Sequence, residues 1–207
     1  SIASNVNSTV TYSISGLDSD STGVITFTDG TTNVTVNVSA NGSGSADLST
    51  LSDGSITALL AVTDDASNTA TGSSDTATLD TSAPTVTVTL ADTALKVGET
   101  SLVTFTFSEV VTGFAAADVT VANGSISEPS SSDGGTTYTA TYTPTDDITD
   151  ATNVITVDKT GVVDSASNAG VSTTSSSNYT IDTVEPTVTV TLADTALKVD
   201  RKSTLLN

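Results

Sequence analysis

One segment of this chain occurs twice, and it limits how the rest can fold. Residues 84–97 return without change as residues 186–199, about a hundred residues later, which is the size of a domain. Each copy begins Pro-Thr-Val-Thr-Val-Thr-Leu, and this alternation predicts a strand with Val86, Val88 and Leu90 on one face. The proline lies where a strand can begin, because the ladder needs no N–H there. The chain is therefore expected to be a series of domains, each opened by this strand.

The repeat also sets the expected domain boundaries. We expect a β-sandwich over residues 1–82, a second sandwich of a different subtype over residues 83–184, and the first strand of a truncated third repeat over residues 185–199. The two copies diverge after Val199, and the one arginine of the chain lies beyond that point. Residues 200–207 are therefore expected to be non-native or truncated sequence.

Apolar runs rich in Val and Thr alternate with turn residues along the chain, and no segment has a helical period. The predicted fold class is therefore all-β, with tandem sandwiches joined by short linkers. A hairpin is expected around Asp29-Gly30, residues 56–62 are expected to form a central strand, and Pro129 is expected on a sheet edge. The expected strands are residues 9–15, 24–28, 34–38, 56–62 and 71–79 in the first sandwich, and residues 85–90, 102–107, 119–121, 137–143, 154–157 and 178–181 in the second.

The charge of the chain excludes several classes of function. It has 24 acidic residues, 5 basic residues and no histidine, which gives a net charge of −19. Nucleic acid is therefore not an expected partner, because phosphate binding needs clustered Lys and Arg, and membrane insertion is not expected either. Without Cys there are no disulfides and no thiolate zinc sites, and without His or Cys the common nucleophile–base pairs are absent. We expect a monomer that is not an enzyme.

Strand direction is expected to bring several acidic loops to one end of the second sandwich. The carboxylates of Asp80, Glu109 and Asp164 and the amide of Asn168 are expected to converge there, and Asp118 is a further candidate. Carboxylate and amide oxygens without His or Cys favour a hard cation, and Ca²⁺ fits best because it accepts about six to eight irregular oxygen ligands. The sequence therefore predicts a calcium site where the first sandwich meets the second.

Weaker sites are expected elsewhere. The first sandwich is expected to repeat the arrangement, and the last strand of the second sandwich ends on an aspartate that could meet a third module. These candidates are Asp18, Asp20, Asp64 and Asn68 in the first sandwich and Asp182 at the far end of the second. A single Asp or Asn in a loop is equally well explained by turn geometry. Three carboxylates at one point are harder to explain that way, because they repel one another.

Several motifs, taken together, resemble the bacterial Ig-like repeats of giant RTX and biofilm-type surface adhesins. The motifs are residues 80–88, 98–114, 123–127, 131–140 and 164–168 of the second sandwich and residues 53–58 and 64–68 of the first. The resemblance implies Ig-like sandwiches in long arrays, calcium between modules, type I secretion and a place on the bacterial cell surface. The Asp-x-x-Gly-Asn loop usual in that family has Ser67 and Ser167 at its glycine position.

Two functions follow from this pattern. The first is a structural extender, rigidified by calcium at its junctions, which projects a distant binding domain for adhesion and biofilm formation. Its partners would be neighbouring repeats of the same chain. The alternative is an Ig-like module that binds a sugar or protein target directly, and such a module should present a cluster of exposed aromatic residues. Rows of Thr on the strands could also suggest ice binding, but they are short and are expected on twisted sheets, so ordinary solvated strand faces explain them.

Overall fold

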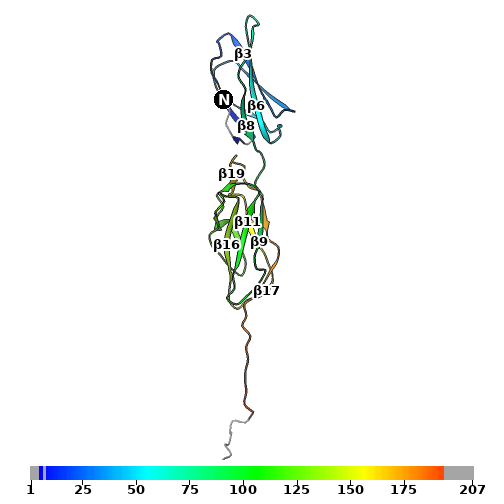
Figure 1. The fold of residues 1–207 in the computed structure, drawn as a ribbon, viewed down its shortest axis with the longest axis vertical. Helices are drawn as coiled ribbons and strands as arrows, with labels where there is room; N and C mark the ends of the chain where they lie inside the picture. The colour runs from blue at the N-terminus through cyan, green and yellow to red at the C-terminus, as the bar shows by residue number, and fades with distance from the viewer. Residues whose placement is uncertain (1–4, 7, 194–207) are drawn as a thin grey trace, which may run out of the picture.

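The computed structural model describes residues 5–6 and 8–193, and it shows two β-sandwiches placed end to end (Figure 1). The all-β prediction is confirmed, since the only helical element described is a short 3₁₀ turn, Ala116–Asp118. We refer to the sandwich that ends with the linker Thr81–Ser82 as the first module and to residues 83–184 as the second module. Each module has its own cluster of buried apolar side chains.

The first module places two strands against a larger sheet. The large sheet has the order β1-β8-β6-β3-β4, with β7 added to β6, and the small sheet is β2-β5. The bounds are β1 Asn5–Val6, β2 Thr9–Ile14, β3 Ser21–Thr28, β4 Asn33–Val38, β5 Gly42–Asp47, β6 Gly54–Asp64, β7 Thr69–Thr71 and β8 Asp75–Leu79. The expected hairpin is present, since β3 pairs with β4 around Asp29-Gly30, and β6 lies inside the sheet as expected. Alternation along β3 buries Ile25 and Phe27 in the core.

Two features of this module differ from expectation. Residues 71–79, expected as one strand, form the end of β7 and all of β8, because Gly-Ser-Ser at 72–74 has little strand preference and separates them. Strand β5 was not expected, because its Gly and Ser residues are poor strand formers. It forms because β2 lies beside it, and the ring of Tyr12 covers Gly44 so closely that a side chain there would clash.

The second module has four sheets, of which the largest has the order β14-β16-β11-β9 with β15 added to β16. The others are β10-β21-β17, β13-β18-β20 and β12-β19. The bounds are β9 Val86–Leu90, β10 Ala94–Lys96, β11 Ser101–Phe107, β12 Val111–Thr112, β13 Val119–Val121, β14 Gly124–Ile126, β15 Ser130–Ser131, β16 Thr137–Pro144, β17 Thr149–Asn153, β18 Ile155–Asp158, β19 Val163–Asp164, β20 Thr173–Ser175 and β21 Tyr179–Asp182. Pro129 separates β14 from β15 along the same edge, as its missing N–H requires.

The repeated segment has different surroundings in its two copies. In the first copy, β9 pairs with β11 and buries Val86 and Val88, as predicted. In the second copy, the described residues 186–193 form no strand, and Val188 and Val190 are 89% and 84% exposed. This part of the chain runs straight away from the second module (Figure 1). The remainder of the expected third-repeat strand and the expected tail, residues 194–207, lie outside the described residues.

Candidate metal centre at the joint between modules

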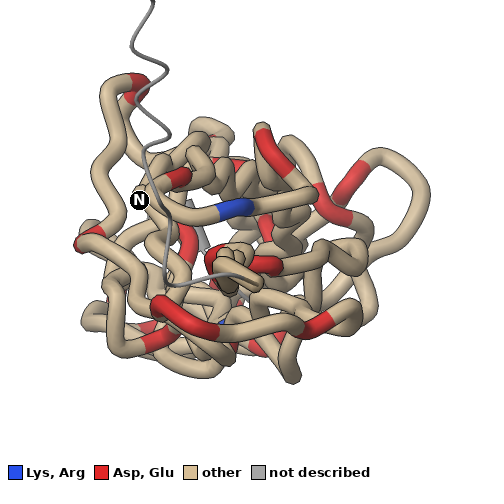
Figure 2. Tube along the Cα trace, turned by 90° about the horizontal axis from the view of Figure 1, so that it is seen from below, with Lys and Arg blue, Asp and Glu red and all other residues tan. Residues whose placement is uncertain are grey.

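Acidic side chains surround the molecule, but they gather closely at one place. Viewed along the long axis, acidic positions lie on all sides and basic positions are few (Figure 2). At the joint between the modules, Asp80, Glu109 and Asp164 each offer a carboxylate oxygen, and these atoms all lie within 4.8 Å of one another. Asp164 is 5% exposed, while Asp80 and Glu109 are partly buried. The structure therefore brings together the three carboxylates expected to converge.

The two modules share this cluster. Asp80 directly follows β8, the last strand of the first module, whereas Glu109 lies between β11 and β12 and Asp164 ends β19 in the second. Strand β12 pairs with β19, with Val111 opposite Asp164, so this pairing fixes Asp164 close to the Glu109 loop.

An aromatic cluster supports the second module's side of the joint. The ring of Phe114 lies 5.0 Å from Phe105, 5.2 Å from Phe107 and 5.2 Å from Tyr138, all edge to face. The hydroxyl of Tyr138 donates to the carbonyl of Val111 at 3.1 Å. Because rigid packing beneath β12 limits backbone motion, Glu109 and Asp164 are held on an ordered platform.

The loop from Asp164 to Asn168 also joins the two modules. The carboxylate of Asp164 accepts hydrogen bonds from the backbone N–H and the side-chain Nδ2 of Asn168, both at 2.8 Å. The same Nδ2 donates to the carbonyl of Asp80 at 2.8 Å. Ser167 takes the left-handed conformation, with φ 71°, so serine occupies the position where the resembled family usually has glycine. Asn168, expected as an oxygen ligand, thus contacts Asp80 and Asp164 through its amide nitrogen.

Electrostatic repulsion within the cluster is visible in the pKa of Glu109. Partial burial raises this pKa, and the nearby carboxylates of Asp164 and Asp80 raise it further. Neither lysine in the described part of the chain neutralises the cluster, because Lys96 pairs with Glu99 at 3.5 Å and the ammonium group of Lys159 donates to the hydroxyl of Thr174 at 2.7 Å. The donors are all hard oxygens, so this set suits Ca²⁺ better than a transition metal.

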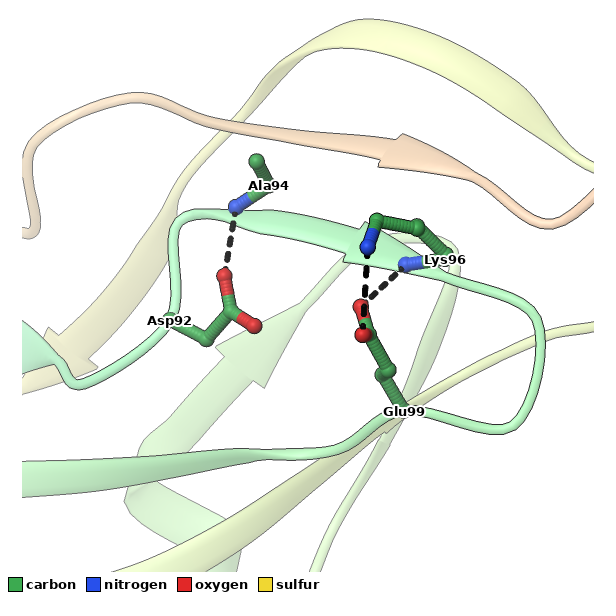
Figure 3. Close-up of polar contacts among 4 residues, drawn as sticks. All are labelled: Asp92, Ala94, Lys96 and Glu99. Carbon is green, nitrogen blue, oxygen red and sulfur yellow. Dashed lines mark hydrogen bonds and ion pairs between the residues drawn. The ribbon is translucent and has the colours of Figure 1, made fainter.

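Other acidic residues are engaged in backbone hydrogen bonds. Asp92 accepts the N–H of Ala94 at 2.9 Å, and Glu99 accepts the N–H of Lys96 at 2.9 Å as well as pairing with its ammonium group (Figure 3). These contacts hold both ends of β10, whose Leu95 is buried. They show that turn geometry explains much of the acidic content, as expected for single aspartates in loops.

The candidates Asp118 and Asp182 lie outside the cluster. Asp118 accepts the N–H of Ala115 at 2.9 Å and so caps the 3₁₀ turn. Asp182 accepts the hydroxyl of Thr149 at 2.9 Å at the opposite end of the module. Each of these two carboxylates therefore has a local structural contact.

The first module repeats the loop of the second module but not the cluster. Asp64 accepts the backbone N–H and Nδ2 of Asn68 at 2.7 and 2.8 Å, and Ser67 has φ 66°, which matches the loop at Asp164. Hydrogen bonds from Asn68 lower the pKa of Asp64. Asp18 and Asp20 are exposed nearby, since Ser21 lies opposite Asp64 in the β3–β6 ladder. Over the part of the chain that the structure describes, three acidic groups come together only at the joint.

One acidic residue at the joint was not expected from the sequence. Asp53, in the loop before β6, accepts the backbone N–H and hydroxyl of Thr81 at 2.9 and 2.8 Å through Oδ1, and the hydroxyl of Ser82 at 2.8 Å through Oδ2. Partial burial raises its pKa, but the hydrogen bonds from Thr81 and Ser82 outweigh this and hold the pKa below its usual value. Asp53 and Gly54 form a pair that is typical of a turn, and nothing in this pair predicts that Asp53 contacts the linker.

Comparison with known proteins supports the resemblance. A family model described as a bacterial Ig-like domain matches residues 80–181. A 1.5-MDa bacterial ice-binding adhesin, studied for host cell surface retention, has a TM-score of 0.44 and 21% identity over 86% of this chain and 60% of that chain. A tetra-tandem repeat from the extending region of a large adhesion protein has a TM-score of 0.37 and 22% identity over 87% of this chain and 48% of that chain.

The chain thus spans 60% or less of the length of these two structures. A search of curated proteins finds no match. Nowhere in the described residues is there a helix with the length and apolar character needed to span a membrane.

Proposed function

Residues 80–181 belong to the bacterial Ig-like domain family, and we propose that this chain is an extender of a repetitive adhesin on the bacterial surface. In this proposal Ca²⁺ binds between the modules and stiffens the joint, so that an array of modules holds a distant binding domain away from the cell. Type I secretion and a part in biofilm formation belong to the same proposal, and their support is the family resemblance.

The calcium part of this proposal is supported by one observation: both modules contribute carboxylates to the cluster. Asp80 belongs to the first module, and Glu109 and Asp164 belong to the second. A divalent cation held by all three would replace repulsion across the joint by attraction to a common charge. Extracellular calcium modules bind with dissociation constants on the order of 10⁻⁴–10⁻³ M, so millimolar calcium outside a cell is enough to load such a site.

The described aromatic residues argue for an extender over a module that binds a target directly. The chain has 4 Phe and 4 Tyr. All four Phe, together with Tyr142 and Tyr179, are buried, while Tyr12 and Tyr138 are half-buried and pack against the two cores. Aromatic surfaces of the kind that bind sugars are therefore not presented by these residues.

The first test compares the wild-type chain with Asp80→Ala in EDTA and in millimolar CaCl₂. In 10 mM CaCl₂, roughly 10 to 100 times the expected dissociation constant, the site adds about 1.4–2.7 kcal/mol, so the wild-type melting temperature should rise by several degrees. Small-angle scattering should show a larger maximum dimension in calcium, because a bound ion aligns the modules. Asp80→Ala should lose both responses while both sandwiches stay folded.

Asp182→Ala is the matched control. Asp182 occupies the same place in the repeat as Asp80 but lies outside the cluster, so this variant should keep the full calcium response at the joint. Superimposable melts and scattering curves of the wild type in EDTA and calcium would rule out the proposal. A full calcium response in Asp80→Ala would place the ion elsewhere.

A further inference from the structure

The linker between the modules is held by hydrogen bonds that involve no cation. Thr81 and Ser82 donate three hydrogen bonds to the carboxylate of Asp53, at 2.8 to 2.9 Å. In addition, the N–H of Ser82 donates to the carboxylate of Asp80 at 3.1 Å. The first two linker residues are therefore attached to the first module, although they lie beyond its last strand.

The second module holds the linker from the other side. Pro84 is buried, and the N–H of Thr85 donates to the hydroxyl of Ser108 at 3.0 Å. Between Ser82 and Pro84 lies only Ala83, which makes none of these anchoring contacts. A joint with one such residue has little room to bend unless one set of anchors is released.

The chain segment that leaves the second module is also held at the equivalent position of the repeat, but by backbone groups instead of a carboxylate. Thr183 corresponds to Thr81 in the repeat and is 2% exposed. Its hydroxyl donates to the carbonyl of Thr145 at 2.8 Å, its N–H donates to the carbonyl of Ile148 at 2.8 Å, and the N–H of Ile148 donates back to its hydroxyl at 2.9 Å. In both modules the residue after Asp80 or Asp182 is thus bound by the loop before a strand that pairs with the last strand of the module, β6 with β8 and β17 with β21. The first module uses a carboxylate for this purpose, and the second module uses backbone groups.

We propose that Asp53 is the positioning residue of the joint: it fixes the linker to the first module and thereby aims the Asp80 carboxylate at Glu109 and Asp164. The anchoring part of this proposal holds without any cation. The aiming part rests on the proposed calcium function. The hydrogen bonds of Asp53 go to Thr81 and Ser82 and not to the cluster, so Asp53 acts through these two linker residues.

The test measures the distance between the modules in the full chain. The chain has no native Cys, so spin labels can be attached to two engineered cysteines, Thr35→Cys in the first module and Thr141→Cys in the second, both at exposed strand positions. Pulsed electron paramagnetic resonance then gives the distance distribution in EDTA and in CaCl₂. In EDTA the parent should give a narrower distribution than Asp53→Ala, and CaCl₂ should narrow the distribution of the parent further.

Asp47→Ala is the matched control, because Asp47 also accepts a loop hydrogen bond in the first module, from Ser49 at 2.9 Å, but does not contact the linker. It should keep the narrow distribution. The double change Thr81→Val and Ser82→Ala removes two of the donors and leaves Asp53 in place, so it should also broaden the distribution. This variant keeps the proposal testable if Asp53→Ala disturbs the first module.

Calcium titration separates the two parts of the proposal. Loss of an outer-shell partner typically weakens metal affinity about tenfold or more, so Asp53→Ala should raise the half-saturating calcium concentration by about tenfold. If calcium has no effect on the wild type while Asp53→Ala still broadens the distribution in EDTA, the calcium function fails and the anchor stands. If Asp53→Ala and the double change Thr81→Val with Ser82→Ala both give the same distance distribution as Asp47→Ala in EDTA, the proposed role of Asp53 is overturned.

Discussion

Two tyrosines in the core of the second module differ in how their hydroxyl groups are satisfied. Their rings pack edge to face at 5.3 Å. The hydroxyl of Tyr142 donates to the carbonyls of Ala122 and Asn123, at 2.8 and 3.0 Å. The hydroxyl of Tyr179 is buried and has no hydrogen-bond partner in the described part of the chain, and burial raises its pKa. A buried polar group without a partner costs free energy, so the two hydroxyls should affect stability in opposite ways.

We therefore predict different outcomes for the same chemical change at the two positions. Tyr142→Phe removes the hydroxyl donor of the Ala122 carbonyl, while the Asn123 carbonyl keeps the N–H of Thr145 as a donor, so this change should lower the free energy of unfolding of the second module by about 1 kcal/mol. Tyr179→Phe removes only an unpaired hydroxyl and should leave that free energy unchanged within about 0.5 kcal/mol, or raise it. Urea unfolding followed by circular dichroism measures both. Equal losses in the two variants would contradict the assignment.

The residues of the cluster illustrate what a single sequence can predict. Strand order and direction were enough to bring Asp80, Glu109 and Asp164 together, because consecutive antiparallel strands deliver their loops to alternate ends. The contacts of Asn168 and Asp53 could not be predicted in this way. They depend on which loop lies against the linker, and a distance of 28 residues between Asp53 and Thr81 leaves no periodic signal.

At the scale of strands, the repeated segment shows that sequence alone does not make a strand. Val88 is 7% exposed in β9, and its counterpart Val190 is 84% exposed. The two residues have identical neighbours in sequence, and only β9 has a partner, β11. The stability of the strand therefore comes from burial against the sheet rather than from local preference.

This pair gives a prediction with an internal control. Val88→Ala should cost about 2 kcal/mol, because it removes buried methyl groups and leaves a cavity. Val190→Ala should change stability by less than about 0.5 kcal/mol, as expected for an exposed site. Thermal melts of the two single variants measure this difference in stability. A comparable loss in Val190→Ala would mean that this segment packs against the described modules in solution.

The strands that the sequence did not predict share a cause. Strand β17 reads Thr-Asp-Ala-Thr-Asn and β20 reads Thr-Thr-Ser, with no apolar alternation. Strand β17 forms because it pairs with β21, which carries the buried Tyr179 and Ile181. Apolar alternation reveals the strands that build a core, whereas polar strands at its border are selected by their neighbours.

At the scale of the whole molecule, the net charge is −19, and the fold uses several of the carboxylates that carry it as hydrogen-bond acceptors. Hydrogen bonds from backbone or side-chain groups lower the pKa of several aspartates. These are Asp29, Asp47, Asp64, Asp133 and Asp158. A lowered pKa contributes stability above the unfolded value near 3.9, and this stability is lost as pH falls through the folded pKa. Glu109 has the opposite effect on stability, because its pKa is raised in the folded protein. Its carboxyl group favours the folded state at low pH, and this stability is lost as pH rises through the folded pKa.

We predict that the melting temperature in EDTA at high salt falls steeply below about pH 4, as these aspartates are protonated. High salt reduces the repulsion between surface charges, which acidification would otherwise relieve. Asp29→Asn with Asp133→Asn should make this fall shallower. Glu109→Gln should raise the melting temperature at pH 7 in EDTA, and this gain should disappear near pH 4. A melting temperature that stays constant from pH 6 to pH 3 would contradict the role given to these carboxylates.

The parallel pairing of β10 with β21 has a mechanical meaning for an elongated molecule. Ala94, Leu95 and Lys96 lie opposite Thr180, Ile181 and Asp182, so β10, which follows the first strand β9, and β21, the last strand of the second module, are neighbours that point the same way. When the two ends of this module are pulled apart, the tension reaching β10 draws it toward its beginning, and the tension on β21 draws it toward its end. The strands are then loaded in shear, and the hydrogen bonds between them must yield together rather than one after another.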